Sequence, residues 1–344
     1  MPILLKDSTA SGLHAQLAPL GVSLRLARRL QAAVVKRDAF PESLPEVSDK
    51  VLARVRDEVR LPRLTLRDKA VSTRDGFAKY LFQGDGPEPF EAVAIPLVHR
   101  AGEEKTVVCV SSQVGCALGC MFCATGRMGF VRNLSAWEMV DSVIRIAADS
   151  PHPVRGVVFM GMGEPMLNYE AVVRAARILS EPCGMALSAK AISISTAGVV
   201  PGIRRFIADR LPFRLIVSLT SADPSRRGGL MPVERAYPLP ELMAAIREYH
   251  EASRQRVVLT WTMIAGFNTR DEDAVQLAEL VRDLPITLDL IDVNDASGRF
   301  RPPSSYELNA FRDALRKHLK MPVARRYSGG RDIHAGCGML AGTK

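Results

Sequence analysis

The chain has 344 residues, of which 47% are hydrophobic, so it is long enough for one large α/β domain with an appendage and a sizeable core. No apolar run approaches the roughly 20 residues of a membrane span, and the N-terminus lacks the charged and apolar regions of a signal peptide, so we expect a cytosolic protein without a membrane partner. The formal net charge of +9 favours a polyanionic partner such as nucleic acid, with a solvated basic surface as the alternative.

Residues 1–65 predict a small helical unit, because two segments place apolar residues at helical spacing among basic ones. Residues 66–104 alternate apolar and polar side chains and carry glycines, which predicts a β-rich extension of short strands and turns. The expected elements are helices over Leu20–Val35 and Glu46–Leu61 and strands over Lys79–Phe82 and Ala92–Ile95.

From residue 105 to about residue 320, predicted strands alternate with predicted helices, and the capping-box pair Ser135 and Glu138 marks one helix start. About six βα units are too few for a closed eight-unit barrel, so we predict a partial, open (β/α)6 barrel, with a flat doubly wound sheet as the alternative. Residues 321–344 are expected to add a C-terminal strand and a Gly-rich, mobile loop over Ser328–Gly342. The predicted strands are Thr106–Val110, Val157–Met160, Ala191–Ser195, Leu215–Leu219, Val257–Met263 and Thr287–Val293. The predicted helices are Ser135–Ala148, Asn168–Leu179, Val200–Ile207, Leu239–Tyr249, Asp271–Arg282 and Ser304–Leu319.

Four of the six cysteines fall between positions 109 and 123, which in a cytosolic chain indicates a metal or iron–sulfur site rather than a disulfide framework. Cys116, Cys120 and Cys123 have the spacing C-x3-C-x2-C directly after a predicted strand. Three thiolates on one loop can each bind a different iron of a [4Fe–4S] cubane and leave the fourth iron open. An open iron can chelate S-adenosylmethionine (SAM) and deliver one electron to its sulfonium. A zinc site is less favoured, because no fourth ligand follows at finger-like spacing.

An extended motif surrounds these cysteines. The run from Cys109 to Gly126 reads CVSSQVGCALGCMFCATG, and Gly129–Leu134 reads GFVRNL. Together they resemble the RlmN/Cfr family of radical SAM RNA methyltransferases, and the resemblance runs from about residue 75 to residue 342. It implies a radical SAM barrel with a [4Fe–4S] cluster and SAM as cofactors, and an RNA-contacting role for the N-terminal helical unit. It also implies a one-electron donor such as flavodoxin.

Residues at the ends of the predicted strands are candidate SAM contacts. Gly163 and Glu164 follow the second strand, where glycines let the backbone approach a ligand and a carboxylate can bind an amino group; a plain turn is the alternative. They match the GEP motif with which the family binds the SAM amino group. The other family positions correspond to Ser195, Ser218, Leu219, Thr220 and Asn294.

The chain departs from the family pattern at two of these strand ends. Thr220 stands where the family usually has histidine, and Asp292-Val293 stands where it usually has a proline–aromatic pair. These departures leave SAM binding in place and leave the exact RNA substrate open.

The resemblance assigns three catalytic roles. Cys337, in a Gly-flanked loop, matches the cysteine that the family methylates, and Cys109 matches the resolving cysteine that forms a transient disulfide with it. Glu91 aligns with the family's proton acceptor. From the residues alone, the two cysteines would be small buried hydrophobes and Glu91 a surface carboxylate. Cys183 matches no family position and is expected to be incidental.

The implied substrate is an adenine of 23S rRNA in the peptidyl-transferase centre, methylated at C2 as in RlmN or at C8 as in Cfr, and RlmN-type enzymes also modify tRNA. We predict C2 methylation through an S-methylcysteine at Cys337. The alternatives are C8 methylation, a family relative that acts on another RNA and, in another class, a non-catalytic RNA-binding protein with a structural metal. The N-terminal helices and the pairs Arg226-Arg227 and Arg325-Arg326 are candidate phosphate contacts, with solvated surface charge as the alternative.

Overall fold

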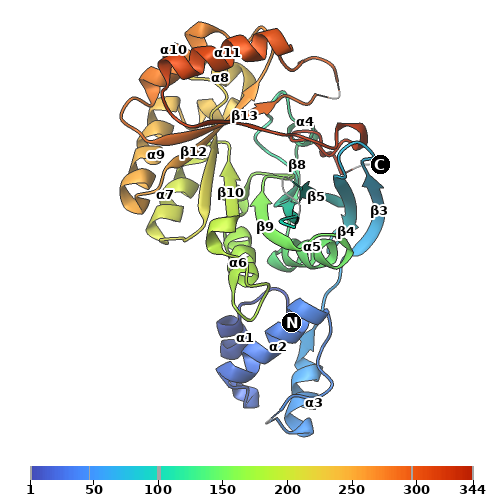
Figure 1. The fold of residues 1–344 in the computed structure, drawn as a ribbon. Helices are drawn as coiled ribbons and strands as arrows, with labels where there is room; N and C mark the ends of the chain where they lie inside the picture. The colour runs from blue at the N-terminus through green and yellow to red at the C-terminus, as the bar shows by residue number, and fades with distance from the viewer. Residues whose placement is uncertain (1, 46, 99–101, 296, 343–344) are drawn as a thin grey trace.

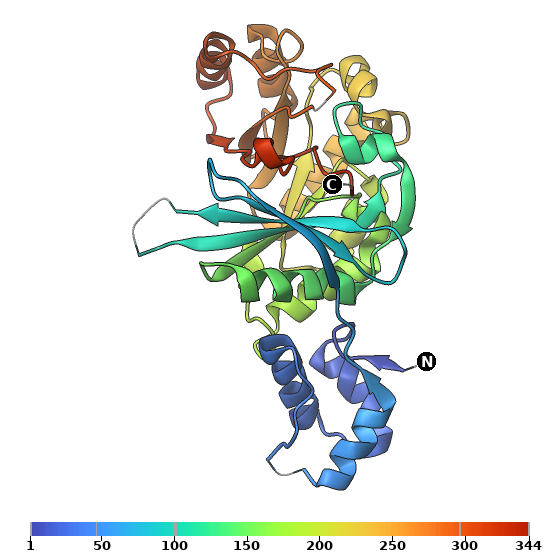
Figure 2. The same cartoon turned by 90° about the vertical axis from the view of Figure 1, so that its right-hand side faces the viewer.

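The computed structural model describes residues 2–45, 47–98, 102–295 and 297–342 (Figure 1). The N-terminal elements are β1 Ile3–Leu4, α1 Ala10–Leu17, α2 Leu24–Arg37, α3 Asp49–Glu58 and β2 Val59–Arg60, with a 3₁₀ turn at Ala18–Leu20. They enclose an apolar core of their own, and β1 pairs with β2 in parallel. In both views this helical unit projects from one end of the main body (Figure 1, Figure 2).

Serine caps set the starts of two N-terminal helices. The Ser23 hydroxyl accepts the Leu26 N–H at 3.2 Å and begins α2, and the Ser48 hydroxyl accepts the Val51 N–H at 3.4 Å and begins α3. The second predicted helix therefore starts at Asp49 and not at residue 46, which lies outside the described residues. It also ends before residue 61, because the chain turns into β2.

One ten-stranded sheet forms the main body of the described chain. Its strands are β3 Thr65–Val71, β4 Ala78–Gln83, β5 Phe90–Leu97, β6 Lys105–Val110, β9 Val154–Phe159, β10 Ile192–Thr196, β11 Arg214–Ser218, β12 Val257–Met263, β13 Ile286–Asp292 and β14 Val323–Arg326. Strands β6 and β9 to β14 run parallel and follow one another in chain order, while β3 to β5 extend the sheet as antiparallel strands.

The strand order distinguishes the two predicted architectures. A doubly wound sheet reverses its strand order at a switch point, whereas here the order never reverses along the parallel strands. The predicted partial barrel is confirmed, and β14 adds a seventh parallel strand beside β13.

Helices follow the strands at the positions where apolar spacing predicts them. They are α5 Ala136–Asp149, α6 Tyr169–Ser180, α7 Val200–Ala208, α9 Leu239–Ser253, α10 Asp271–Leu280 and α11 Ser305–His318. The capping box of Ser135 and Glu138 at the start of α5 is present. The sequence patterns do not predict several short elements. These are α4 Ala124–Met128, α8 Pro224–Leu230, β7 Gln113–Gly115 and β8 Phe130–Asn133, and the 3₁₀ turns at Pro165–Asn168, Ala189–Ala191, Pro232–Arg235 and Arg331–Ile333. None of the helices in the described ranges has the length and apolar character to cross a bilayer.

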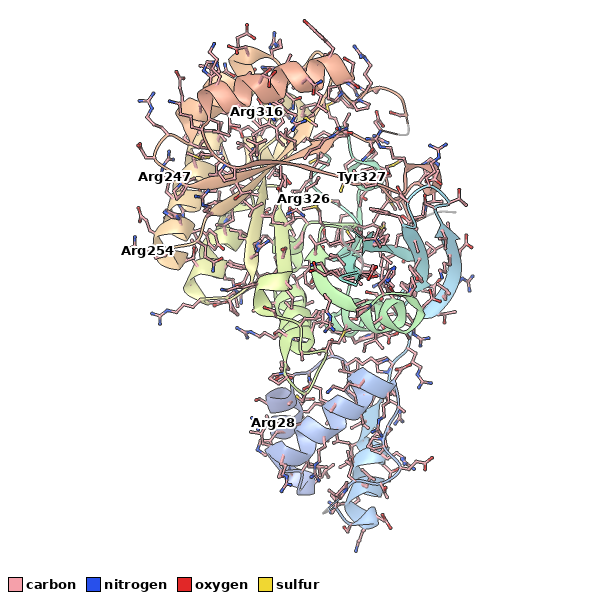
Figure 3. The ribbon with its side chains drawn as sticks, in the orientation of Figure 1. Arg28, Arg247, Arg254, Arg316, Arg326 and Tyr327 are labelled. Atoms are coloured by element: carbon pink, nitrogen blue, oxygen red, sulfur yellow. The ribbon has the colours of Figure 1, made fainter. Side chains whose placement is uncertain are left out.

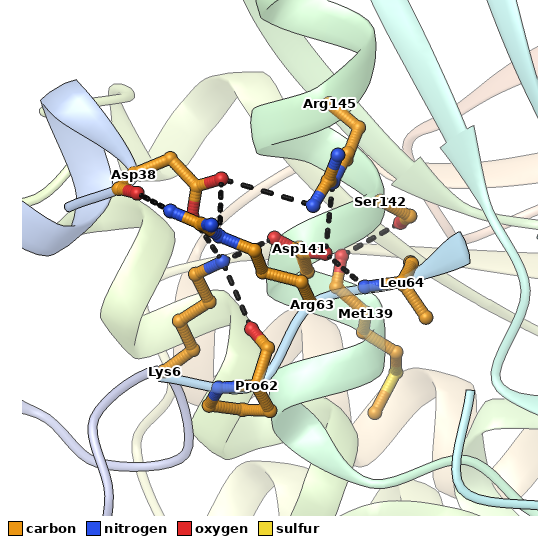
Figure 4. Close-up of polar contacts among 9 residues, drawn as sticks. All are labelled: Lys6, Asp38, Pro62, Arg63, Leu64, Met139, Asp141, Ser142 and Arg145. Atoms are coloured by element: carbon orange, nitrogen blue, oxygen red, sulfur yellow. Dashed lines mark hydrogen bonds and ion pairs between the residues drawn. The ribbon is translucent and has the colours of Figure 1, made fainter. Parts of the chain in front are cut away.

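A buried ionic network joins the helical unit to the barrel (Figure 4). The Lys6 side chain is fully buried, and its ammonium contacts the carboxylates of Asp141 on α5 and of Asp38, the latter at 2.5 Å. The second oxygen of Asp141 accepts the Leu64 N–H at 2.7 Å and the Arg145 Nε–H at 3.2 Å. The charges of Lys6 and Asp141 are buried away from water, and each is satisfied by several partners. This network therefore fixes the orientation of the helical unit on α5.

Candidate active site

A pocket of 150 Å³ lies where the parallel strands end, which is where barrels of this kind place their ligands. Residues from the ends of β9, β10, β11 and β13 line it together with the cysteine loop and the C-terminal segment. Of the residues predicted for the site, those that line it are Cys116, Cys120, Cys123, Gly163, Glu164, Ser195, Ser218, Asn294 and Cys337. The fold thus brings Cys337 into the same pocket as the cysteine loop, which lies far away in the sequence.

The cysteine loop is held on both sides by backbone hydrogen bonds. The Cys116 N–H donates to the Gly129 carbonyl at 2.9 Å, and Gly115 before it has a φ of 71°. A Cβ at Gly115 would lie 1.8 Å from that same carbonyl, so only glycine fits there. On the other side, the Ala124 N–H donates to the Gly338 carbonyl at 2.7 Å, which joins the loop to the segment that carries Cys337.

The three loop thiols form a donor set that fits an iron–sulfur cubane. Burial raises the pKa of Cys116 to about 12 and raises that of Cys120, and the neighbouring Cys123 raises both further. Iron binding would displace these protons, because the thiolate is the ligand. Across the described ranges, no group of three or more His, Cys, Asp or Glu side chains is arranged to hold one metal ion. In a cubane each thiolate binds a different iron, so the three sulfur atoms need not surround a single ion.

Glu164 is a buried carboxylate aligned by the turn after β9. Its oxygens accept the N–H groups of Met166 at 3.0 Å and Ala197 at 2.8 Å. Burial raises its pKa to about 7, and these two hydrogen bonds oppose the rise. Gly163 before it has a φ of 95°, and a Cβ there would lie 2.5 Å from the Gln113 side chain, so the turn depends on glycine. A carboxylate with free lone pairs in this pocket can accept hydrogen bonds from an amino group.

The ends of β10, β11 and β13 add polar groups suited to SAM. Ser195 and Ser218 line the pocket, and the Asn294 Nδ2 donates to Ser328 Oγ at 2.8 Å and to the Cys337 carbonyl at 3.2 Å. The Asn294 Oδ1 is buried and has no partner among the described residues, which leaves an acceptor for a polar ligand.

Leu219 and Thr220 follow the pocket residue Ser218 at the end of β11. Both are fully buried, and neither is among the residues that line the pocket. Thr220 has a left-handed φ of 63°, which is uncommon for a β-branched residue, and its hydroxyl has no partner among the described residues. Their assignment to SAM binding stays a prediction.

Cys337 lies close enough to Cys109 to raise the pKa of the Cys109 thiol. Cys337 is exposed to the pocket, yet the surrounding protein raises the pKa of its thiol by desolvation, and the Ser328 hydroxyl opposes this rise. Burial raises the pKa of Cys109, the neighbouring Cys337 raises it further, and the Met160 N–H lowers it. Cys109 does not line the pocket itself, and both thiols are free.

Glu91 is buried in β5 and is not among the residues that line the pocket. One of its oxygens accepts the N–H groups of Ala341 at 2.8 Å and Gly342 at 3.0 Å, and the other lies 2.8 Å from the Lys79 Nζ. The interpretation as a surface carboxylate is wrong, because the side chain is 1% exposed. Its carboxylate is hydrogen-bonded to the segment that follows Cys337.

Two further expectations need correction. Arg227 is fully buried and donates to Glu234 at 2.5 Å and to the Ala197 carbonyl at 2.7 Å, so it cannot contact an RNA phosphate. The segment Ser328–Gly342 is packed against the barrel and is not a free loop, because the Thr125 hydroxyl donates to the Leu340 carbonyl at 2.6 Å. The hydrogen bonds from Ala341 and Gly342 to the β5 carboxylate hold the same segment.

Sequence reasoning missed several residues of the site. Ser328, Asp292, Thr260 and Thr262 contact or line the pocket, yet none belongs to a motif that would single it out. The one available signal was the departure from the family pattern at Asp292.

Comparisons with known proteins agree with this site. Residues 110–281 match the Radical SAM superfamily. A probable RNA methyltransferase of Myxococcus xanthus is 47% identical over 99% of this chain and 94% of its own length. The dual-specificity RNA methyltransferase RlmN of Syntrophobacter fumaroxidans is 41% identical over 98% of both chains. The crystal structure of a radical SAM methyltransferase from Sphaerobacter thermophilus has a TM-score of 0.89 at 38% identity and covers 99% of this chain and 100% of its own. The chain belongs to the RlmN family of radical SAM RNA methyltransferases, SAM-dependent enzymes with a [4Fe–4S] cluster.

Proposed function

We propose that this enzyme methylates carbon C2 of an adenine in 23S rRNA, and that tRNA is a second substrate. The observation that carries the proposal is that Cys337 lines the same pocket as Cys116, Cys120 and Cys123. A methyl carrier at that place can meet both SAM and an RNA base. The name of the Syntrophobacter fumaroxidans relative, a dual-specificity RNA methyltransferase, supports two RNA substrates.

The chemistry explains why such a site is needed. An adenine ring C–H is neither acidic nor nucleophilic, so direct displacement from SAM fails and a cofactor must supply the reactivity. When bound, the cluster on Cys116, Cys120 and Cys123 together with SAM supplies a carbon-centred radical that abstracts a hydrogen atom. Glu164 binds the SAM amino group, and Asn294 offers its free Oδ1 to a polar group of SAM.

The residues of the chain carry the methyl group and the protons. The Cys337 thiolate first takes a methyl group from one SAM, and the Ser328 hydroxyl favours that thiolate by hydrogen bonding. After hydrogen abstraction from this S-methyl group, its carbon would add to the adenine. Restoring the aromatic ring would then need the loss of one electron, which the oxidised cluster would take, and of the ring proton, for which Glu91 is the proposed acceptor. The Cys109 thiolate would then attack the Cys337 sulfur and break its bond to the methylene carbon. That carbon would take a proton and become the methyl group of the released base, which leaves a disulfide between the two cysteines.

The activity is tested by mass spectrometry of the RNA product. Reconstituted enzyme is incubated with SAM, reduced flavodoxin as electron donor, and 23S rRNA or tRNA from a strain that lacks the gene. We expect 2-methyladenosine in the digested RNA. The appearance of 8-methyladenosine would overturn the assignment of C2, and no methylated adenine in either RNA would overturn the proposed substrate.

A second candidate is a related enzyme that methylates another RNA. It is favoured by the departure at Asp292, whose carboxylate lines the pocket and pairs with two arginines. The non-catalytic alternative is disfavoured, because a structural metal site has no use for Cys109 beside an exposed Cys337.

A further inference from the structure

A second cleft opens beside the active pocket. Its volume is 320 Å³, and arginines from three segments line it: Arg74, Arg325, Arg326 and Arg331. Asp292 lines both the cleft and the active pocket, so a ligand in one lies next to a ligand in the other. The lining also includes Asp75, Asp332 and Tyr327.

Asp292 holds two of these arginines with a single oxygen. Its Oδ2 lies 2.7 Å from Arg325 Nη2 and 3.0 Å from Arg331 Nη2. This one carboxylate faces two guanidinium groups, so the three groups together carry a net positive charge, while Asp75 and Asp332 also line the cleft and Arg326 is paired with Asp289 at 2.5 Å. The two side chains are 47% and 43% exposed, and each guanidinium has five N–H donors, so most of the donors remain for a ligand. Guanidinium groups that are fixed in place lose little entropy when they bind an anion with several oxygens.

Tyr327 adds an aromatic surface to the same cleft. It is 72% exposed, its hydroxyl donates to Asp75 Oδ2 at 2.9 Å, and its ring meets Phe77 edge-on at 6.1 Å between centroids. Asp75 also accepts the Gly330 N–H at 2.9 Å, so its carboxylate serves to hold this loop. A ring fixed at its hydroxyl end and along one edge, and otherwise exposed, is suited to stack on a nucleobase.

The cleft is connected to the methyl carrier by the next residue. Ser328 follows Tyr327, and its hydroxyl accepts the Cys337 N–H at 3.1 Å. Figure 3 shows Tyr327 close to Arg326 at the end of β14, whereas Arg316 lies on the outer helix α11. An RNA strand with a base stacked on Tyr327 would therefore lie next to Cys337, the residue proposed to react with the target adenine.

We propose that this cleft binds the nucleotide next to the target adenine, with its phosphate on Arg325 and Arg331 and its base on Tyr327. The inference rests on the proposed action on RNA and deepens it, because it names the part of the RNA that the enzyme holds outside the pocket. It requires a single-stranded or splayed segment at the target, since a base stacked within a duplex could not reach Tyr327.

Binding of RNA, measured apart from methylation, tests the proposal. The probe is a fluorescein-labelled transcript of the 23S rRNA segment around the peptidyl-transferase centre, and fluorescence anisotropy gives Kd at several salt concentrations. We expect Arg325→Gln/Arg331→Gln to raise Kd about tenfold and to flatten the dependence of log K on log salt by about 0.7 per lost phosphate contact. The control Arg316→Gln removes an equally basic side chain that is 65% exposed on α11, and it should leave Kd within about twofold.

Substitutions of Tyr327 provide a second test, because they leave the buried Asp292 paired with Arg325 and Arg331. We expect Tyr327→Leu to raise Kd about tenfold, because it removes the stacking surface, and Tyr327→Phe to stay within about threefold. If Kd were unchanged in both Arg325→Gln/Arg331→Gln and Tyr327→Leu, the proposal that this cleft binds RNA would be wrong. Wild-type enzyme that binds the transcript but methylates neither 23S rRNA nor tRNA would reject the proposed function, while the variants would still decide whether the cleft binds RNA.

Discussion

The Ser328 hydroxyl accepts the backbone N–H of Cys337 at 3.1 Å. The same oxygen accepts Nδ2 of Asn294 at 2.8 Å, so one hydroxyl joins the end of β13 to the segment that carries the exposed thiol. The Ser328 hydroxyl also acts on the Cys337 thiol itself: burial raises the pKa of that thiol, and the hydroxyl lowers it. Ser328 is thus a positioning residue for Cys337, the proposed methyl carrier.

Replacement of Ser328 should slow the methylation of Cys337. In Ser328→Ala the thiol loses the hydrogen bond that lowers its pKa, so at a given pH less thiolate is present and the rate profile moves to higher pH. We expect about a tenfold lower rate at pH 7, the effect of about one hydrogen bond to a charged group. The measurement is uptake of methyl label from SAM as a function of pH. Ser328→Thr should restore the rate, and a Ser328→Ala profile equal to that of the wild type would remove the assigned role.

Binding of SAM should depend on pH through Glu164. Burial raises the pKa of this carboxyl to about 7, so it loses its charge as the pH falls through that value. A protonated carboxyl is a weaker acceptor for the SAM amino group, and we expect the Kd of SAM to rise between pH 8 and pH 6. Calorimetry on anaerobic, cluster-loaded enzyme measures this. Glu164→Gln should bind SAM weakly at every pH, and a Kd of the wild type that does not change over this range would contradict the role of the carboxylate.

Loss of any one loop cysteine should cost the cluster. A cubane with two thiolates and two open irons is labile, so Cys116→Ala, Cys120→Ala and Cys123→Ala should each fall from about four irons per chain to nearly none. Cys183→Ala is the matched control, because its thiol contacts Gln31 at 2.9 Å and no residue of the pocket. Iron and sulfide analysis after anaerobic reconstitution gives the result. A full iron complement in any of the three variants would show that the cysteine is not a ligand.

The ionic network at Lys6 should dominate the stability of the junction. Lys6→Met leaves Asp141 with less compensation in a fully buried position, which we expect to lower the free energy of unfolding by about 3–5 kcal/mol. The double variant Lys6→Met/Asp141→Leu should recover part of this loss, since it removes both buried charges. The exposed pair of Arg316 and Asp313 is the control, and Arg316→Gln should change stability by less than about 1 kcal/mol. Urea unfolding that gives Lys6→Met the same stability as Arg316→Gln would contradict the assigned role of the network.

The strands and helices of the barrel can be predicted from the sequence, because apolar periodicity and capping residues are local features of each helix or strand. The pattern does not predict α8 over Pro224–Leu230, whose two adjacent arginines and two glycines carry no apolar spacing. It likewise places Arg227 at the surface, although the Glu234 carboxylate and the carbonyls of Leu219 and Ala197 satisfy its guanidinium in the interior.

The cysteine motif identifies its three thiols because they are close in sequence. Ser328 and Asp292 are different, since Ser328 contacts Asn294 and Asp292 contacts Arg325 and Arg331 across 33 to 39 positions of the chain. The hydrogen bond from the Ala341 N–H to Glu91 also joins distant parts of the chain, because the two residues are 250 positions apart. Such contacts require the three-dimensional structure.

We propose that the methyl group reaches RNA through Cys337 and that Cys109 releases the product. The variant Cys109→Ala is the sharpest test, because it should still methylate Cys337 and attack the adenine but lacks the thiolate that attacks the Cys337 sulfur and breaks its bond to the product carbon. We predict that Cys109→Ala has turnover close to zero and forms a covalent protein–RNA adduct that survives a denaturing gel. Nuclease treatment should return the adduct band to the mobility of the free protein, and the adduct should be absent from Cys109→Ala/Cys337→Ala. Loss of packing alone would lower stability by roughly 1–2 kcal/mol and leave turnover intact. A Cys109→Ala enzyme that turns over at the wild-type rate and forms no adduct would contradict the account.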